Sequence, residues 1–463
     1  MKDQNTILRN IGEKFADLDL LSENAISFNK SAPNFKSSRT RMYGYMPLKD
    51  FIWKNYSLKD RVLDKLDDPI SSRPAKNSKR NTALYFHIPF CQVKCPFCHY
   101  FTGAGASPSL ISNYVQALKR HLDMILNKVK QDLKVDAIHF GGGTPTYLND
   151  SHLKELLGHI KDRVEINSNI MYTFEASPES LVTKDSKKKL KIMLETGANR
   201  LSIGVQSFDD SVLKIAGRGH NSEQAIKSIN LARNSGFKNI NIDILLGIPG
   251  QTLDNWKITL DKIREIQPES VSVYYLHLVD NLYMDKLFKD KRHLFPNNGE
   301  MLTMNLLLIE MLFSLGYVQN RPCSFTKTKE HFCYSELVDI LSVGPSSWSF
   351  FNESHFQYIN SLPKYMKSIN SGKFPLQEKR KFSKDLLMKK DFSSLIQFIN
   401  SGGVDKTWFR KEYGIDLEVA FGGKMENLVK QGLLENNKDS CVLSFKGSLC
   451  ADEIVRYIYS ENE

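Results

Sequence analysis

The sequence has no uninterrupted apolar run of the roughly eighteen residues that a membrane-spanning helix needs. Its opening stretch, MKDQNTILRNIGEKF, also lacks the apolar core of a secretory signal peptide. We therefore expect a cytoplasmic protein without a membrane span.

Cysteine is scarce, with 7 among 463 residues. Small secreted domains that depend on disulfides use cysteine far more densely. Three of the seven, Cys91, Cys95 and Cys98, form a C-x3-C-x2-C pattern, and the others are scattered. The clustered cysteines therefore predict a metal site and not a disulfide framework.

Acidic residues are outnumbered by basic ones: the chain has 63 Lys and Arg and 52 Asp and Glu, which gives a formal net charge of +11. Basic clusters lie at 187–191 and 379–390. Runs of this kind are most often a solvated face. We infer no nucleic-acid partner from them.

The length and the hydrophobic content of 41% predict one large domain with smaller attachments. Residues 1–80 are polar and irregular, and we expect an N-terminal extension there. The core barrel is predicted over 81–300. Barrel completion and a connecting region follow over 301–375, and a small C-terminal domain occupies 376–463.

Between residues 83 and 280, short β-rich runs alternate with helix-length segments. Six runs predict strands: ALYFHI, VDAIHFGGG, MYTFEAS, RLSIGVQS, NINIDILLGIP and SVSVYYLHL. A helix with one apolar stripe is predicted over 109–131. Repeated βα units imply parallel strands with right-handed crossovers. We therefore predict an α/β fold: a full or partial (β/α) barrel, or an open doubly wound sheet.

The pattern changes after residue 300 to a helical stretch, MLTMNLLLIEMLFSLGY. GPSSWSFF at 344–351 follows and predicts either a turn that faces the substrate or a hairpin that packs Trp348 and Phe350 against the barrel. Residues 376–458 indicate short helices and a hairpin. This resembles a small α-rich, winged-helix-like module. We expect it to serve as a lid or packing domain without contact to nucleic acid.

Functional residues in parallel βα folds lie at the carboxyl ends of the strands. The three cysteines follow the first predicted strand, and GGGTPT follows the second. Glu175 and Gln206 end the third and fourth strands, and Asp243 lies within the fifth. The sequence therefore predicts a single site at one edge of the sheet.

Three cysteines are one fewer than a closed site needs, because structural zinc sites and closed iron–sulfur clusters take four ligands. Three thiolates on a [4Fe-4S] cluster leave one iron open, and the amine and carboxylate of S-adenosylmethionine (SAM) can bind there. One electron then cleaves the sulfonium and gives a 5'-deoxyadenosyl radical. A zinc site completed by His87 or His99 is the alternative.

Five further motifs occur in order: YFHIPFC, GGGTPT, FEASPE, RLSIGVQSF and NIDILLGIPGQT. With these motifs and the aromatic Phe97 before the third cysteine, the chain resembles the radical SAM superfamily. More closely, it resembles the oxygen-independent coproporphyrinogen III oxidase-like (HemN/HemW-like) family. That family also contains haem chaperones and class C methyltransferases. The resemblance is strong over 83–280 and weak over 300–463.

The resemblance implies a role for each residue at a matching motif position. Cys91, Cys95 and Cys98 would hold the [4Fe-4S] cluster as metal ligands. The implied SAM-binding residues are Tyr85, Phe97, Gly142, Gly143, Thr144, Glu175, Gln206, Arg218 and Asp243. Three of these are also implied as catalytic residues: Tyr85, Glu175 and Gln206.

These implied roles have a physical basis. Gly142 and Gly143 have no side chain that would keep the backbone away from the SAM amino group. Carboxylates can accept hydrogen bonds from the ribose hydroxyls or the ammonium, and Arg218 can pair with the SAM carboxylate.

The resemblance leaves the reaction open. Tyr100 stands where coproporphyrinogen oxidases have a further cysteine, and His99 stands where haem chaperones tend to have an acidic residue. We therefore predict class C transfer of a methyl or methylene group to an sp2 carbon of an unsaturated or heteroaromatic substrate, with a second SAM. A haem chaperone and a coproporphyrinogen oxidase are the alternatives.

Reductive cleavage requires a one-electron donor, and we expect a flavodoxin-type partner. The expected substrate is a small molecule or a tetrapyrrole. A protein that only holds and hands over haem is the alternative from a different class. Its candidate axial ligands are His139, His277 and Cys323.

Overall fold

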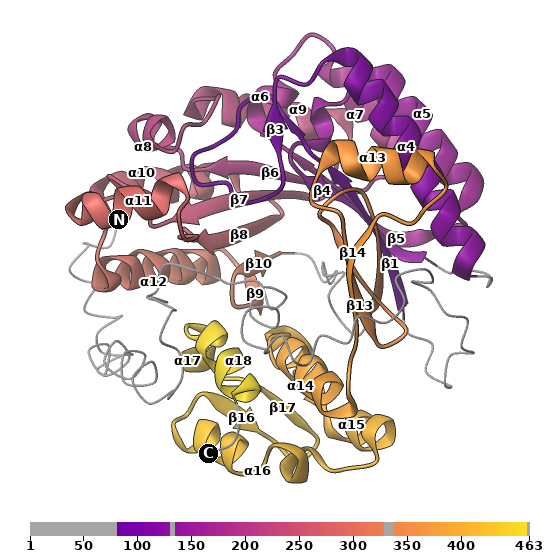
Figure 1. Cartoon of the computed structure of the whole chain (residues 1–463). Helices are drawn as coiled ribbons and strands as arrows, with labels where there is room; N and C mark the ends of the chain where they lie inside the picture. The colour runs from indigo at the N-terminus through magenta and orange to yellow at the C-terminus, as the bar shows by residue number, and fades with distance from the viewer. Residues whose placement is uncertain (1–80, 130–134, 328–337, 461–463) are drawn as a thin grey trace.

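The computed structural model describes residues 81–129, 135–327 and 338–460 (Figure 1). Its centre is a twelve-stranded sheet in the order β14-β13-β12-β11-β1-β4-β5-β6-β7-β8-β10-β9. The strands from β11 to β8 in this order are parallel to their neighbours. They are β1 (Asn81–Ile88), β4 (Val135–Gly142), β5 (Ile166–Ala176), β6 (Arg200–Gln206), β7 (Ile240–Leu246), β8 (Ser270–Tyr275) and β11 (Val338–Val343). All six strands predicted from the sequence are thus confirmed.

Antiparallel strands extend the sheet on both sides. They are β10 (Ser324–Thr326) and β9 (Val318–Arg321) beyond β8, and β12 (Trp348–Phe351), β13 (Ser354–Tyr358) and β14 (Leu376–Lys381) beyond β11. Strands β14 and β9 are the two ends of the order and are not paired with each other in the described residues. The sheet is therefore a partial barrel, and the full barrel is not what the chain forms.

Helices between the parallel strands lie along the outer side of the curved sheet (Figure 1). They are α4 (Pro108–Val129), α5 (Asp150–Arg163), α6 (Pro178–Leu181), α7 (Ser186–Glu195), α8 (Asp210–Ile215), α9 (Ser222–Ser235) and α10 (Leu253–Ile266). α11 (Tyr283–Asp290) and α12 (Asn298–Ser314) follow β8, and α13 (Leu362–Asn370) packs on α4. The helix predicted over 109–131 is α4. Its apolar stripe, including Leu118 and Leu122, is buried as predicted.

An aromatic stack crosses the first three strands of the chain. Phe86, Phe140 and Phe174 are opposite one another in the parallel register, and their ring centroids lie 4.7 and 4.4 Å apart. All three side chains are fully buried. Since successive side chains on a strand point to opposite faces, the neighbours Tyr85 and His139 point to the other face of the sheet.

The C-terminal part has its own apolar core. It contains a sheet in the order β15-β17-β16. Its elements are α14 (Lys384–Leu395), β15 (Val404–Asp405), α15 (Lys406–Tyr413), α16 (Leu417–Lys430), β16 (Leu434–Asn436), β17 (Ser440–Leu443), α17 (Phe445–Ser448) and α18 (Ala451–Tyr459). Phe392, Phe409 and Phe421 are buried in one cluster. Helices with a small sheet agree with the predicted α-rich, winged-helix-like part.

The sequence did not predict most of the antiparallel strands. For GPSSWSFF a turn and a hairpin were both expected, and the structure forms the hairpin from β12 and β13. These strands have only 3 to 6 residues, too few for a clear alternating pattern. The division into four domains remains a prediction, and residues 1–80 lie outside the described residues.

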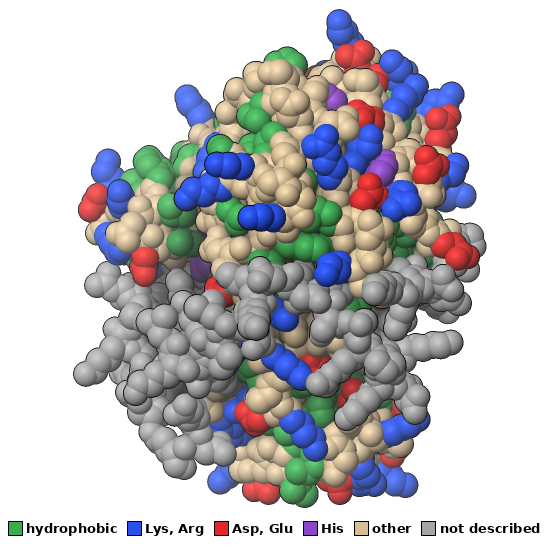
Figure 2. Space-filling view, turned by 45° about the vertical axis from the view of Figure 1, so that its right-hand side comes forward, with side chains coloured by type: hydrophobic (Ala, Val, Ile, Leu, Met, Phe, Trp, Pro, Cys, Tyr) green, Lys and Arg blue, Asp and Glu red, His purple; other side chains and the backbone are tan. Residues whose placement is uncertain are grey.

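Lys and Arg side chains are spread over the visible surface and interspersed with Asp and Glu (Figure 2). Within the basic run 187–191, Lys189 is an exception, because it is buried and donates to the carbonyl oxygen of Thr146 at 3.0 Å. No helix in the described ranges combines the length and the apolar character that crossing a membrane requires.

Candidate functional site

The cysteine loop, defined here as residues 91–104, follows β1 directly. It is closed by a short parallel pairing between β2 (Phe90–Cys91) and β3 (Gly103–Ala104). The backbone amide of Cys98 donates to the carbonyl oxygen of Cys95 at 3.0 Å. Cys91 and Cys95 are buried, and Cys98 is half-buried. The three thiols therefore lie in one compact loop at the carboxyl end of the first strand.

Each thiol has a polar neighbour. The Thr144 hydroxyl donates to Cys91 Sγ at 3.6 Å, and Arg218 Nη1 donates to Cys95 Sγ at 3.0 Å. Cys98 Sγ lies 3.9 Å from the hydroxyl oxygen of Thr102. Burial raises the pKa of the Cys91 and Cys98 thiols, and the hydrogen bond from Thr144 opposes this increase at Cys91. Donors aimed at sulfur are the surroundings that a thiolate ligand needs.

Cys95 and Cys98 lie close enough to Cys91 that charge repulsion from both raises the pKa of its thiol. Among the residues the structure describes, no three His, Cys, Asp or Glu side chains converge on one metal-ion position. A zinc site completed by His87 or His99 stays an alternative prediction. A cubane cluster takes each thiolate at a different iron, so its ligands need not meet at one point.

The first two glycines of GGGTPT are packed against the site. A Cβ on Gly141 would lie 2.7 Å from Glu175 Oε1. A Cβ on Gly142, which has a φ of +105°, would lie 2.5 Å from the His87 ring. Both positions are closed to a side chain by protein atoms, independently of any cofactor. At Gly142, where the sequence predicts a glycine that lets the backbone approach SAM, the His87 ring is a second reason for the absence of a side chain.

The third glycine attaches the turn to the cysteine strand. The amide of Gly143 donates to the carbonyl oxygen of Ile88, and the amide of Thr144 donates to that of Phe90, both at 2.8 Å. A Cβ on Gly143 would lie 2.8 Å from each of these oxygens and 3.0 Å from Cys91 Sγ. The glycine turn and the cysteine loop are therefore one structural unit.

Tyr85 and Glu175 both contact His139 on the inner face of the sheet. His139 Nε2 lies 2.8 Å from Glu175 Oε1, and the amide of Gly142 donates to Glu175 Oε2 at 3.3 Å. The ring of Tyr85 stacks on His139, and its hydroxyl lies 3.3 Å from His87 Nδ1. The side chain of Glu175 remains 38% exposed, so it can still reach a ligand.

Asp243 sits in a polar cluster on the next strands. Its carboxylate accepts from Ser202 Oγ at 3.1 Å and from Asn241 Nδ2 at 2.8 Å. Burial, together with the negative charge of Glu175, raises the pKa of Asp243 to about 6. The negative charge of Glu175 thus acts on Asp243, and a shared role of the two carboxylates at a SAM site remains a prediction.

Gln206 and Arg218 meet at Gly204. A Cβ on this glycine would lie 3.0 Å from Gln206 Nε2 and 3.7 Å from Arg218 Nη2. Gln206 has a φ of +70°, an unusual backbone conformation for a residue with a side chain. Such conformations concentrate at functional sites. The structure therefore places Gln206 beside Arg218, which contacts the cysteine loop through Cys95.

Phe97 differs from the other predicted SAM-binding residues. It packs against the main apolar core. Its neighbours His99 and Tyr100 stack on each other, and His99 meets the ring of His277 edge-on with centroids 5.0 Å apart. The three proposed haem ligands do not converge with one another in the described part of the chain.

Two buried residues near Arg218 were not singled out from the sequence. Glu179 lies in α6, and His220 lies just before α9; the two are hydrogen-bonded at 3.0 Å. Glu179 ends the FEASPE motif, and His220 ends the run Gly217-Arg218-Gly219-His220. A buried acid and a histidine in two motifs that already carry site residues were the available signal.

The observed groups fit a three-thiolate cluster with SAM beside it. Arg218 Nε is buried and has no hydrogen-bond partner among the described residues, so it has a donor to offer. Hydrogen-bond donors point at two of the sulfurs, and the charge of Glu175 acts on Asp243. The individual roles of these residues remain predictions.

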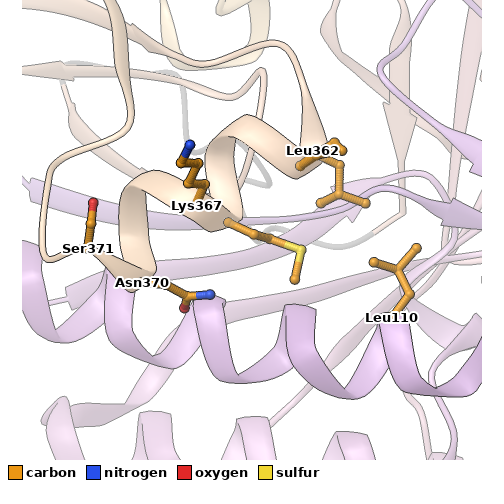
Figure 3. Close-up of a pocket in the computed structure, with 7 residues that line it drawn as sticks. Leu110, Leu362, Lys367, Asn370 and Ser371 are labelled. Carbon is orange, nitrogen blue, oxygen red and sulfur yellow. The ribbon is translucent and has the colours of Figure 1, made fainter.

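A separate open groove lies between α4 and α13, with a volume of about 670 Å³ (Figure 3). Leu110 and Leu362 face each other across it, whereas the side chain of Lys367 points away from α4. Its lining includes none of the predicted site residues. The groove is therefore distinct from the site at the strand ends.

Residues 85–263 match the family described as the radical SAM superfamily. The chain therefore carries a radical SAM domain, and its predicted family resemblance is confirmed. That family implies a [4Fe-4S] cluster and SAM as cofactors.

Individual relatives show which radical SAM proteins the chain resembles. The heme chaperone HemW of Bacillus subtilis (strain 168) is 28% identical over 379 residues, which cover 80% of this chain and 97% of the relative. The oxygen-independent coproporphyrinogen III oxidase of Helicobacter pylori is 25% identical over 388 residues, which cover 79% of this chain and 83% of the relative. The solved coproporphyrinogen III oxidase HemN of Escherichia coli shares the fold, with a TM-score of 0.73 and 21% identity. The match covers 90% of this chain and 99% of HemN.

Proposed function

We propose that this chain is an enzyme that holds a [4Fe-4S] cluster through Cys91, Cys95 and Cys98 and uses it to cleave SAM reductively. The observation that carries the proposal is the hydrogen-bonded junction of the cysteine loop, the glycine turn and Arg218. When bound, the cluster supplies the electron for cleavage and one open iron for the amine and carboxylate of SAM.

The chain's own residues bind and orient SAM. The guanidinium of Arg218 pairs with the SAM carboxylate, because a fork of donors matches a carboxylate in geometry and charge. The backbone from Gly142 to Thr144 receives the amino group. Glu175 and Asp243 accept hydrogen bonds from the ribose hydroxyls or the ammonium.

Tyr85 and Gln206 complete the pocket wall. The stacked ring of Tyr85 and the polar side chain of Gln206 lie beside the groups that face SAM. A radical at a primary carbon abstracts hydrogen from whatever it meets, so the pocket must exclude water and oxygen around it. An external one-electron donor, such as a flavodoxin-type protein, would supply the electron.

Haem handling is the candidate function that the comparisons favour. The match to HemW runs through 97% of that protein and 80% of this chain, so it includes the regions outside the radical SAM domain. His277, whose ring meets that of His99 in the cysteine loop, offers a haem ligand. Methyl or methylene transfer with a second SAM and coproporphyrinogen oxidation remain predictions; none of the relatives named above is described as a methyltransferase.

One anaerobic experiment tests the proposal. The reconstituted protein is mixed with SAM and dithionite, with and without haem, and 5'-deoxyadenosine and S-adenosylhomocysteine are quantified. Deoxyadenosine formation that disappears in Cys95→Ala supports reductive cleavage, and tight haem binding supports haem handling. Formation of both products would favour methyl transfer instead. A protein with a full cluster that forms no deoxyadenosine would sink the proposal.

A further inference from the structure

The segment that carries Arg218, residues 216–221, packs directly against the cysteine loop. A Cβ on Gly217, which has a φ of +64°, would lie 2.5 Å from Pro96 Cδ. A Cβ on Gly219 would lie 3.3 Å from Val93 Cγ2. The two glycines therefore allow a close approach that brings the arginine between them to the cysteines.

The guanidinium of Arg218 has three protein neighbours. Nη1 donates to Cys95 Sγ at 3.0 Å, and Nη2 donates to the carbonyl oxygen of Gly204 at 2.7 Å. Nη2 also lies 3.9 Å from a carboxylate oxygen of Glu179. The side chains of Arg218 and Glu179 are only 8% and 9% exposed. This ion pair is therefore buried, and a buried guanidinium needs a counter-charge.

His220 contacts the same carboxylate oxygen of Glu179 that faces Arg218. His220 Nδ1 lies 3.0 Å from Glu179 Oε2, and His220 Nε2 lies 3.2 Å from the carbonyl oxygen of Val205. The His220 side chain is fully buried. Burial alone would raise the pKa of Glu179, but the hydrogen bond from His220 and the charge of Arg218 outweigh it and hold the pKa at about 2. The carboxylate that faces Arg218 is thus negatively charged.

The connection runs across separate parts of the fold. Glu179 is in α6, directly after β5, and Arg218 and His220 lie between α8 and α9. The carbonyls of Gly204 and Val205 belong to β6. The arrangement therefore ties the arginine to two strand ends as well as to the cysteine loop.

We propose that Glu179 and His220 are positioning residues that hold the Arg218 guanidinium between Cys95 and the carboxylate of SAM. The inference rests on the proposed function, because it assumes a cluster and SAM at this site. Neither residue contacts SAM in this account; both act through Arg218. An ordinary buried ion pair that only stabilises the fold is the alternative.

A double-mutant cycle distinguishes the positioning role from a purely structural ion pair. SAM affinity is measured on reduced, reconstituted protein by titrating the change that SAM causes in the electron paramagnetic resonance (EPR) signal. The variants are Glu179→Gln, Arg218→Ala and their combination. We expect Glu179→Gln to weaken SAM binding about five- to tenfold when Arg218 is present and less than about twofold in the Arg218→Ala background. Equal losses in both backgrounds, or no loss in either, would overturn the inference.

The control is Glu269→Gln, which removes the charge from another Glu–Arg pair. Glu269 Oε1 lies 3.3 Å from Arg233, and Glu269 accepts from the amide of Ile240 at the amino-terminal end of β7. We expect this variant to retain its SAM affinity. A loss equal to that of Glu179→Gln would indicate a general effect on the fold and overturn the inference.

The readouts also separate this inference from the proposed function. If the wild-type protein assembles no cluster or shows no response to SAM, both fail. If the wild type responds and the cycle is additive, only the positioning role fails. Should Glu179→Gln not fold, His220→Gln takes its place in the same cycle, with the same expected dependence on Arg218.

Discussion

Two buried cysteines in different parts of the molecule have opposite surroundings. Cys95 lies in the loop after β1, where Arg218 donates to its sulfur at 3.0 Å. Cys441 lies in β17 of the C-terminal part, within an apolar cluster, and burial raises its pKa to about 12. The first thiol is placed to become a ligand, and the second behaves as a small apolar core residue.

The same contrast separates the two regions. The carboxyl ends of the parallel strands collect half-buried polar groups such as Glu175 and Asp243, which weaken a core unless they bind something. The C-terminal core instead buries aromatic rings such as Phe392 and Phe421, which stack with centroids 4.3 Å apart. Chemistry explains the composition of the first region, and packing explains that of the second.

The largest expected difference comes from one substitution made in both regions. Reconstituted wild type should carry about four irons per chain and absorb broadly near ~400 nm. Cys95→Ala should lose this absorption and most of the iron, because one cluster corner loses its ligand. Cys441→Ala should keep both. Iron and absorption are measured on each anaerobically reconstituted variant, and full iron content in Cys95→Ala would contradict the cluster assignment.

Phe409→Ala tests whether the C-terminal core is energetically separate. Phe409 is fully buried among apolar side chains, so its removal leaves a cavity. We expect the free energy of unfolding of the C-terminal part to fall by about 3–5 kcal/mol in urea titrations. Iron content and SAM binding should stay unchanged. If the variant lost its cluster, the two regions could not be treated as independent.

Arg218→Ala should weaken SAM binding without removing the iron. A hydrogen bond to a charged group contributes about 1.5–3 kcal/mol, which corresponds to roughly 10- to 150-fold in affinity. Arg410→Ala is the matched control, because Arg410 pairs with Asp416 on the surface of the C-terminal part. Equilibrium dialysis with SAM measures both variants, and equal affinity in the two would contradict the assigned role.

The smallest effect is a pH dependence of stability. The pKa of Asp243 is raised to about 6 in the folded protein from an ordinary value near 3.8. The folded state therefore binds a proton more tightly than the unfolded state, and stability falls as the pH rises from about 4 to 6.

Asp243→Asn removes this titration. Relative to wild type, the variant should gain roughly 2 kcal/mol of stability between pH 4 and pH 7. Urea unfolding of the cluster-free proteins at both pH values measures the difference. If the difference in the free energy of unfolding between the variant and the wild type were the same at both pH values, burial would not destabilise the Asp243 carboxylate.

The sequence predicted six of the seven parallel strands because each is a β-rich run, and five of the six carry or precede a motif. GGGTPT could be placed at a strand end for this reason, and its glycines lie against Glu175 and His87 as a close approach requires. The seventh parallel strand, β11, was missed. The antiparallel strands β9, β10, β12, β13 and β14 carry no such motif and are too short to show a clear alternating pattern.

The sequence proposed which residues form the candidate site but not how they contact one another. Arg218 was assigned to SAM, and its contact with Cys95 Sγ could not be inferred, because it depends on how residues 216–221 pack on the cysteine loop. Glu179 and His220 were missed for the same reason. Spacing along the chain does not reveal a buried ion pair between separate loops.

The most direct test of the central claim is EPR spectroscopy of the dithionite-reduced, reconstituted protein with and without SAM. Three protein thiolates leave one iron open, so SAM should bind to that iron and change the signal of the reduced cluster. A reduced cluster whose spectrum stays the same at saturating SAM would contradict a site-differentiated cluster held by Cys91, Cys95 and Cys98.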